Sequence, residues 1–454
     1  MTASISPASA SARPTRVRYG VLGFCSLLAT ITYLDRVCFG TVAPNIQSEF
    51  GLSNSQLGWL FTAFAFAYAI FEVPTGWMGD FFGARRTLIR IVLWWSVFTA
   101  LTGSIYPSLG VFAYGALLAV RFLFGVGEAG AFPNISRALA NWFPSGQRGF
   151  AQGAVWMAGR FGGGITPLVV MLLVYTTVGS DDTKVTHWRH IFWILGGIGV
   201  VWCVVFWFWF RDRPDQHSST NEAERDMILG SAALAEVGHA NVPWGKILTD
   251  GNLWTLCLMY FCAAYGWYFN ITWLPKYLRE YYKVNEETFG LWQFSLLAGA
   301  PLLLGSLACL AGGLMTDFFI RRTGDRKWGR RLFGTIGHAM CALCYFLSLT
   351  ATDPWTFVTF VALAAFCNDL TMGAAWASCI DIGGKYAGIV SGCMNTVGNL
   401  GGAVAGSATG WALDYFETSP AMGWRVNFIS YGVVYLVAVV LWMFFDATKQ
   451  VAQE

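Results

Sequence analysis

The segment GWMGDFF at residues 76–82 recurs as GLMTDFF at residues 313–319, 237 positions further along the chain. A second segment repeats at nearly the same interval, because WRHIF at 188–192 recurs as WRVNF at 424–428, 236 positions later. Two matches in the same order and at nearly one period indicate that the chain consists of two repeated halves.

A third match joins two glycine-rich stretches. RGFAQGAVWMAGRFGG at 148–163 overlays AGIVSGCMNTVGNLGG at 387–402, 239 positions later, with five glycines in register. Glycine lets helix backbones approach each other closely. We therefore interpret these positions as packing sites rather than as direct ligand contacts.

The composition is typical of a membrane protein. Of the 454 residues, 55% are hydrophobic and only 12% are charged, whereas a soluble domain carries about 25% charged residues. Apolar runs of about 20 residues, the length that crosses a bilayer as a helix, recur along the whole chain. This excludes a disordered chain, a soluble enzyme and a disulfide-stapled secreted domain. The net charge of +3 gives no reason to expect a nucleic-acid partner.

We predict an all-α polytopic membrane protein with twelve transmembrane helices, arranged as two parallel six-helix halves around a central cavity. Each repeat covers six spans, an even number, so both halves cross the bilayer in the same direction. Such parallel repeats imply a pseudo-twofold axis along the membrane normal and a site between the halves. The predicted helices lie near residues 20–43, 56–78, 87–106, 109–133, 149–177, 188–210, 253–278, 289–316, 332–352, 354–379, 386–412 and 424–445.

The positions of lysine and arginine set the orientation in the bilayer. If the N-terminus is cytoplasmic, most of the 29 basic residues fall in cytoplasmic segments, which is the usual bias of membrane proteins. We therefore expect a multi-pass protein of the inner (plasma) membrane with both termini in the cytoplasm. The predicted segments are a cytoplasmic tail (1–19), a first six-helix half (20–211), a cytoplasmic linker (212–252), a second six-helix half (253–446) and a second cytoplasmic tail (447–454).

Neither metal chemistry nor enzymatic catalysis is indicated. The eleven cysteines all lie in or beside apolar runs, as small hydrophobic residues do, and the five histidines show no ligand spacing. Cys341 and Cys344 form a CxxC motif, but no second pair supports a metal or redox site. The chain also lacks a GxSxG or HExxH motif in a suitable place. We expect no enzyme activity, no metal and no cofactor.

Seven Asp, Glu and Arg residues fall in the interior of the predicted spans, away from their ends, where a charge at a helix centre costs about 2.5–3.5 kcal/mol on insertion scales. Neighbouring side chains on a helix point roughly 100° apart, so Asp35 and Arg36 cannot pair side by side, and each needs a partner elsewhere. Arg121 and Glu128 lie on one face, about 10 Å apart along the axis, and could share a network or bridge through Asp35. The seven residues are Asp35, Arg36, Glu72, Arg121, Glu128, Arg160 and Asp369.

These charges suggest an anion clamp with a proton relay. Arginine stays protonated, and its planar fork fits a carboxylate, whereas a carboxyl group in a dry site holds a proton more readily than in water. If a substrate anion draws the arginine away, the carboxylate that it leaves can bind a proton. The alternative is that the charges form structural ion pairs between helices. We favour that interpretation for Glu72, and both stay open for Arg121, Glu128 and Asp369.

The second half offers neutral polar and aromatic side chains, which suit recognition of hydroxyl groups or stacking on a ring. From these we select Asn270, Trp376, Asn395 and Asn399 as candidate substrate-binding residues. The alternative for any one aromatic residue is packing against lipid or a neighbouring helix. The full set is Tyr265, Tyr268, Asn270, Thr272, Trp376, Ser378, Asn395 and Asn399.

The segment GWMGDFFGARR at 76–86 resembles the signature G-x-x-x-D-R/K-x-G-R-R/K, which the major facilitator superfamily carries between its second and third helices. Phe81 and Ala84 depart from this signature. The resemblance implies a cytoplasmic latch between the halves that releases during gating. The implied latch residues are Asp80 and Arg85, with Asp317 at the corresponding position of the second half.

Within the superfamily the chain resembles the anion:cation symporter family, which includes galactonate, glucarate and hexuronate transporters, sialin and the vesicular glutamate transporters. The similarity extends from about residue 18 to residue 446. It rests on YLDR at 33–36, RFLFGVGEAGAFP at 121–133, NWFP at 141–144, ITWLPKYL at 271–278 and DIGGKYAG at 381–388.

The resemblance implies roles for individual residues. Arg36 would hold the substrate carboxylate. Asp35 and Glu128 would be proton-coupling carboxylates, with Arg121 as the partner of Glu128. Arg160, a candidate substrate-binding residue, stands where the galactonate transporter has a substrate-contacting glutamine, and this departure leaves the identity of the sugar acid open. The residues that would line the pocket are Tyr33, Tyr68 and Asn395.

We therefore expect a secondary active transporter that uses the proton gradient for symport of an organic anion, such as a hexuronate, aldonate or aldarate, by alternating access. We expect it to work as a monomer. Two alternatives stay open. One is an exchanger of organic anions or a carrier of aromatic or other carboxylates, and the other is a ligand sensor that does not transport.

Overall fold

The computed structural model describes residues 13–144, 147–175, 188–229, 243–284 and 288–451. These residues form α-helices joined by turns and short 3₁₀ segments, and no β-strand occurs among them. Eight stretches are long and apolar enough to cross a membrane by length and composition. The expected all-α polytopic membrane fold is therefore confirmed, while twelve stays a prediction for the number of crossings.

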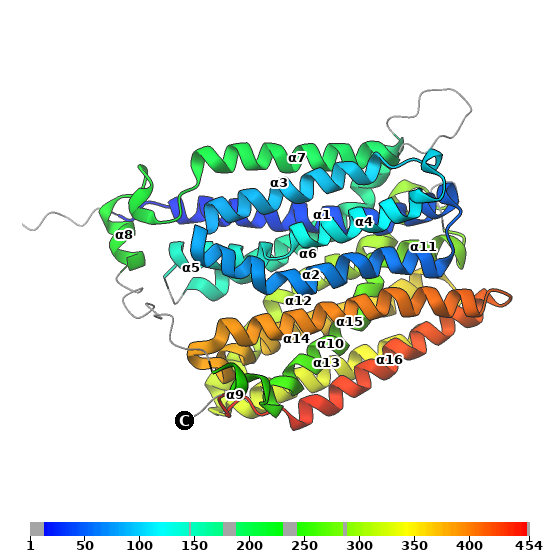
Figure 1. Ribbon diagram of the computed structural model, residues 1–454. Coiled ribbons are helices and arrows are strands. Elements are labelled where there is room, and N and C mark those ends of the chain that lie inside the picture. Colours follow the sequence, from blue (N-terminus) through cyan, green and yellow to red (C-terminus); the bar gives the residue numbers. More distant parts are fainter. Residues whose placement is uncertain (1–12, 145–146, 176–187, 230–242, 285–287, 452–454) are drawn as a thin grey trace, which may run out of the picture.

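The described helices lie in two groups, one from each half of the sequence (Figure 1). Two short helices, α8 (Glu222–Leu229) and α9 (Trp244–Leu248), lie between the groups along the chain. The first group contains α1 (Val17–Phe50), α2 (Asn54–Phe82), α3 (Ala84–Gly103), α4 (Phe112–Glu128), α5 (Ala131–Trp142), α6 (Arg148–Tyr175) and α7 (Trp188–Trp209). The second group contains α10 (Gly251–Thr272), α11 (Leu274–Glu280), α12 (Leu291–Thr323), α13 (Arg326–Ser348), α14 (Pro354–Gly383), α15 (Ala387–Tyr415) and α16 (Pro420–Phe444).

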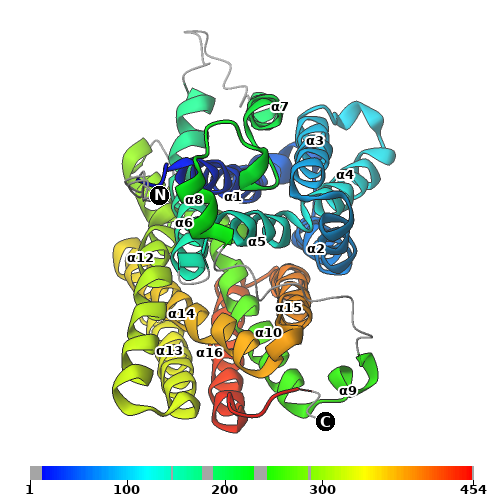
Figure 2. The same cartoon turned by 90° about the vertical axis from the view of Figure 1, so that its left-hand side faces the viewer.

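Two helix pairs make the main contacts between the groups. Helix α2 packs on α15, and α6 packs on α12. Figure 2 views the bundle from the end that carries α8 and α9, and there the two groups face each other across these pairs. The core of the molecule therefore continues from one group into the other.

The predicted helix over 109–133 is broken in the structure. Helix α4 ends at Glu128 and α5 begins at Ala131, because Gly130 between them has a φ of +84°, a conformation that favours glycine. A Cβ atom at Gly130 would lie 2.3 Å from Oγ1 of Thr75 on α2. The break therefore lets the chain pass close to α2.

The predicted helix over 253–278 is also broken, at Trp273, where α10 ends and α11 begins. Pro275 lies in the first turn of α11, a position where its missing N–H is not needed. Just before the break, a Cβ atom at Gly40 of α1 would lie 2.1 Å from the backbone oxygen of Ile271. The broken helix thus makes a close contact with the first group.

The matched glycines pack helices together in both groups. A Cβ atom on Gly162 would lie 2.9 Å from the backbone oxygen of Thr30 on α1, and one on the equivalent Gly401 would lie 2.3 Å from the backbone oxygen of Phe261 on α10. The packing interpretation is confirmed at these positions. It does not extend to Gly388, where nothing lies within 4 Å of an added Cβ.

Polar contacts join the two groups at the end opposite α8 and α9. The carboxylate of Asp414 on α15 accepts hydrogen bonds from the backbone N–H groups of Asn54 (3.0 Å) and Ser55 (2.7 Å) at the start of α2, where a negative charge is favourable. Nζ of Lys276 on α11 donates to Oδ1 of Asn54 (2.5 Å) and to the side chain of Gln47. These contacts tie the groups together at this end.

The contact between α6 and α12 can be tested with two alanine variants of one helix. A Cβ atom at Gly299 would lie 2.0 Å from the backbone oxygen of Gly164, so Gly299→Ala should force the helices apart at a cost of about 1–3 kcal/mol. The matched control is Gly313→Ala, because nothing lies within 4 Å of a Cβ there. Thermal unfolding in detergent should show a lower midpoint for Gly299→Ala alone. Equal midpoints would contradict the close approach.

Candidate functional site

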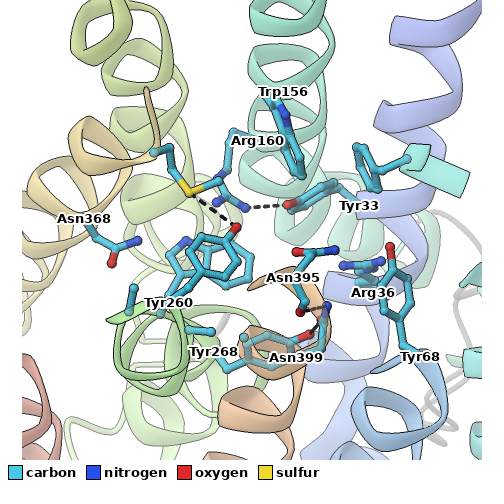
Figure 3. A pocket seen from close by; sticks show the side chains of 16 residues that line it. Tyr33, Arg36, Tyr68, Trp156, Arg160, Tyr260, Tyr268, Asn368, Asn395 and Asn399 are labelled. Carbon is cyan, nitrogen blue, oxygen red and sulfur yellow. Dashed lines mark hydrogen bonds between the residues drawn. The ribbon is translucent and has the colours of Figure 1, made fainter. Parts of the chain in front are cut away.

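A cavity of about 60 Å³ lies between the two groups of helices (Figure 3). Its wall consists mainly of aromatic and amide side chains, together with two arginines. The described residues that line it are Tyr33, Arg36, Tyr68, Phe132, Trp156, Arg160, Tyr260, Ala263, Ala264, Trp267, Tyr268, Asn368, Met372, Asn395, Gly398 and Asn399.

Arg36 of α1 is held by one carboxylate and several aromatic rings. Its Nε donates to Oε1 of Glu128 at 2.8 Å, and Glu128 is fully buried. The guanidinium carbon lies 4.6 Å from the ring centroid of Tyr68 and 5.6 Å from that of Tyr33. Nη2 of Arg36 has no hydrogen-bond partner among the described residues. Arg36 therefore retains donor capacity beside the cavity.

Arg160 of α6 forms a second ion pair, and this pair crosses between the groups. Its Nε and Nη2 donate to the two carboxylate oxygens of Asp369 on α14, at 2.9 and 3.0 Å. Its Nη1 donates to the hydroxyl of Tyr33 at 2.5 Å, and the guanidinium carbon lies 4.0 Å from the ring centroid of Trp267. This two-point geometry is the strong form of an arginine–carboxylate pair.

Asp35 lies behind the cavity in a third charged cluster. Neither of its carboxylate oxygens has a hydrogen-bond partner in the described part of the chain, and only 3% of the residue is exposed. Arg121 and Glu128 are close enough to act on it electrostatically. The guanidinium of Arg121 lies over the ring of Phe39, 4.1 Å from its centroid. The direct partner of Glu128 is Arg36, whereas the resemblance implied Arg121.

Amide side chains of α15 complete the wall. Oδ1 of Asn399 accepts a hydrogen bond from the hydroxyl of Tyr268 at 2.8 Å, and Nδ2 of Asn399 donates to the backbone oxygen of Asn395 at 2.9 Å. Asn395 in turn donates to the carboxylate of Glu72 on α2. A chain of hydrogen bonds therefore runs from α10 through α15 to the first group.

The structure brings most of the expected substrate-binding residues to this one cavity. Asn270 and Trp376 are not among the described residues that line it. Trp376 packs behind the wall, since its ring centroid lies 5.7 Å from that of Trp156 and its indole N–H donates to the hydroxyl of Tyr260 at 3.4 Å. The expected residues that do line the cavity are Tyr33, Arg36, Tyr68, Arg160, Asn395 and Asn399.

Sequence reasoning missed two aromatic lining residues of α10, Tyr260 and Trp267, and placed Tyr268 only in the wider set of polar and aromatic side chains. All three contribute aromatic rings to the wall. Their spacing of seven and eight positions places them on one face of a helix. That spacing could have identified this face, but an apolar helix without charges gives no sign of which side meets the cavity.

The expected latch falls only partly within the described structure. The side chains of Asp80 and Asp317 lie outside it. The backbone N–H of Arg85 donates to Oδ1 of Asp212 at 2.8 Å, and its guanidinium lies 4.3 Å from the ring centroid of Trp207 and donates to that residue's backbone oxygen. Arg85 therefore contacts the end of its own half, at Trp207, and the first residue of the linker, Asp212.

Two repeated groups of membrane-length helices with a polar cavity between them form the architecture of a secondary transporter. The chain belongs to the Major Facilitator Superfamily, because residues 25–406 and 315–454 match that family. The expected resemblance is thereby confirmed, and the chain belongs to a family of membrane transporters rather than enzymes.

Similar proteins support this assignment. The chain is 35% identical over 403 residues to the probable sulfoacetate transporter SauU of Cupriavidus necator, with 88% of each chain covered. It is 29% identical over 424 residues to the probable galactarate/D-glucarate transporter GudP of Escherichia coli K12, with 90% of each covered. Among solved structures, an inward-facing bacterial homologue of the human lysosomal transporter Spinster has a TM-score of 0.72 at 19% identity, covering 95% of this chain and 97% of that one.

Proposed function

We propose that this protein is a secondary active transporter that carries an organic anion together with protons by alternating access. The observation that carries the proposal is the cavity between the two groups, which is lined by Arg36 and Arg160. A permanently charged guanidinium beside an enclosed aromatic wall favours an anionic ligand. The names of the two relatives, one for sulfoacetate and one for galactarate and glucarate, support an organic anion as the substrate class.

In this proposal Arg36 is the primary anion-binding residue. Its Nη2 is buried and has no hydrogen-bond partner among the described residues, so a carboxylate or sulfonate that reaches the guanidinium would satisfy this donor while it competes with Glu128. Tyr68 stacks beside it, and Asn395 and Asn399 supply amide groups on the opposite wall. Trp376 would act indirectly, through its hydrogen bond to Tyr260, and Asn270 stays a candidate substrate-binding residue.

Proton coupling would follow from the pairing of Arg36 with Glu128. An anion that binds Arg36 competes with Glu128, and a buried carboxylate that loses its partner is costly to keep charged. Uptake of a proton by Glu128 removes that cost, so anion and proton binding support each other. Asp35 would be the second proton carrier, and Arg121 would set the charge balance of this cluster.

Alternating access would move the first half (20–211) against the second (253–446) about the linker 212–252. The contacts of Asp414 and Lys276 join the groups at one end and would have to open there, while the latch residues Asp80, Arg85 and Asp317 would control the other end. In the proposed orientation both termini are cytoplasmic in the inner membrane, the latch faces the cytoplasm, and one chain forms a complete pathway.

Replacing Arg36 by alanine should abolish anion accumulation. Charge-assisted hydrogen bonds contribute about 1.5–3 kcal/mol, so uptake should fall at least about tenfold. Proteoliposomes with an inward proton gradient would be offered galactarate, glucuronate, galactonate, sulfoacetate and, as a neutral control, glucose. The control variant is Arg189→Gln, which removes another arginine–carboxylate pair (with Glu49, 2.7 Å) away from the cavity. Unchanged uptake by correctly inserted Arg36→Ala would exclude the anion clamp.

Replacing Glu128 by glutamine should separate transport from its driving force. The amide keeps the size of the side chain but cannot exchange a proton, so counterflow of labelled substrate should persist while accumulation driven by the gradient is lost. Glu224→Gln is the matched control, because Glu224 is fully buried against Arg18 but lies outside the cavity lining. Accumulation that survives in Glu128→Gln would show that another group couples proton and substrate.

A further inference from the structure

We propose that Arg160 is a second anion-binding point, so that the cavity selects small anions with two negatively charged groups over anions with one. The substrates would be short dicarboxylates or sulfonate–carboxylates. This inference rests on the proposed function, which it extends from an anion in general to one with two charged ends. In this inference Arg160 binds the second charged end of the ligand. In the structure the carboxylate of Asp369 pairs with Arg160 in its place.

The two guanidinium groups lie near the same aromatic ring, that of Tyr33. The guanidinium carbon of Arg36 is 5.6 Å from the ring centroid of Tyr33, and that of Arg160 is 5.4 Å from the same centroid. Their separation therefore cannot exceed the two distances combined. Figure 3 shows both arginines and Tyr33 around the same cavity. In the proposal, a ligand with two charged ends and a short carbon chain between them places one end on each arginine.

In the ion pair between Arg160 and Asp369, the arginine faces the cavity and the carboxylate lies away from it. Arg160 lines the cavity, whereas Asp369 is fully buried and is not among the described lining residues. Asp369 sits behind the arginine, where a Cβ atom at Gly305 of α12 would lie 2.3 Å from its Oδ2. An anion in the cavity therefore meets the guanidinium first and competes with Asp369 for it.

The size of the cavity also favours a short ligand. A volume of about 60 Å³ has room for a few water molecules, since roughly 10–15 Å³ is enough for one. A two-carbon or four-carbon dianion needs much less rearrangement of the wall than a six-carbon sugar acid.

The ion pair between Arg160 and Asp369 joins the two groups of helices, so a ligand that replaces Asp369 also changes how the groups are held together. Both arginines belong to the first group, while Asp369 belongs to α14 of the second. When the second charged end of a ligand takes the place of Asp369 on Arg160, it weakens a polar link between the groups. A ligand with only one charged end satisfies Arg36 and leaves this link intact.

The test compares matched pairs of ligands on the purified full chain in detergent. Sulfoacetate is paired with ethanesulfonate, and succinate with butyrate, so each pair differs by one charged group at similar size. Dissociation constants come from calorimetry at fixed pH and ionic strength. The wild type should bind each two-headed anion about tenfold or more tighter than its partner, as an additional charged hydrogen bond would give.

Variants of Arg160 and Asp369 test whether Arg160 binds the ligand or only supports the structure. Arg160→Gln should bring the ratio within each pair close to one, while its affinity for ethanesulfonate stays within about threefold of wild type. Asp369→Asn removes the internal competitor and should tighten sulfoacetate binding. Arg18→Gln, which breaks the buried pair with Glu224 outside the cavity lining, should leave both ratios unchanged.

Three results would overturn the inference: equal binding of both members of each pair by the wild type, an equal loss for both members in Arg160→Gln, or weaker sulfoacetate binding in Asp369→Asn. If Arg160→Gln does not fold, the wild type and Asp369→Asn still decide. Proton-driven uptake of a sugar acid without preference for two charges would remove the inference and leave the proposed function in place. Failure to accumulate any anion would remove the proposed function as well.

Discussion

A charge buried in the membrane interior must have a partner, and this constraint organises the centre of the molecule. Arg36 meets it with Glu128 at 2.8 Å, and Arg160 meets it with Asp369 at 2.9 Å. Breaking either pair without a replacement would leave an uncompensated buried charge, at a cost of about 3–5 kcal/mol. An anion in the cavity is such a replacement. Each buried arginine therefore needs a negatively charged partner, and an anionic ligand can take the place of the carboxylate that serves as this partner in the structure.

The close packing of helices sets the geometry of these pairs. Glycines of α6 leave room for the ring of Tyr33, since a Cβ atom at Gly159 would lie 2.8 Å from that ring and one at Gly163 would lie 3.2 Å from it. The hydroxyl of Tyr33 then reaches Arg160. Larger residues at either position would displace the ring that both arginines approach. The glycine pattern therefore contributes to the site as well as to packing.

The two halves supply different chemistry to one cavity. The first half supplies both arginines, and the second supplies neutral amides and phenols, with Asp369 paired to Arg160 outside the described lining. The second ion pair joins the halves at the cavity, while Asp414 and Lys276 join them at one end. In the proposed mechanism, a ligand that exchanges partners with the central pair changes the balance between these links. Binding and rearrangement thus depend on the same side chains.

The sequence alone determined the membrane fold, the repeat and the set of buried charges, because hydrophobic length, period and intramembrane charge are local properties of the chain. It also identified six of the residues that line the cavity, from Tyr33 to Asn399. Only the tertiary structure decided the pairing. Arg160 and Asp369 are 209 positions apart, and by sequence alone Glu128 could have formed an ion pair with either Arg36 or Arg121. Which charges meet depends on how helices cross and where Gly130 and Trp273 break them, and no single helix carries that information.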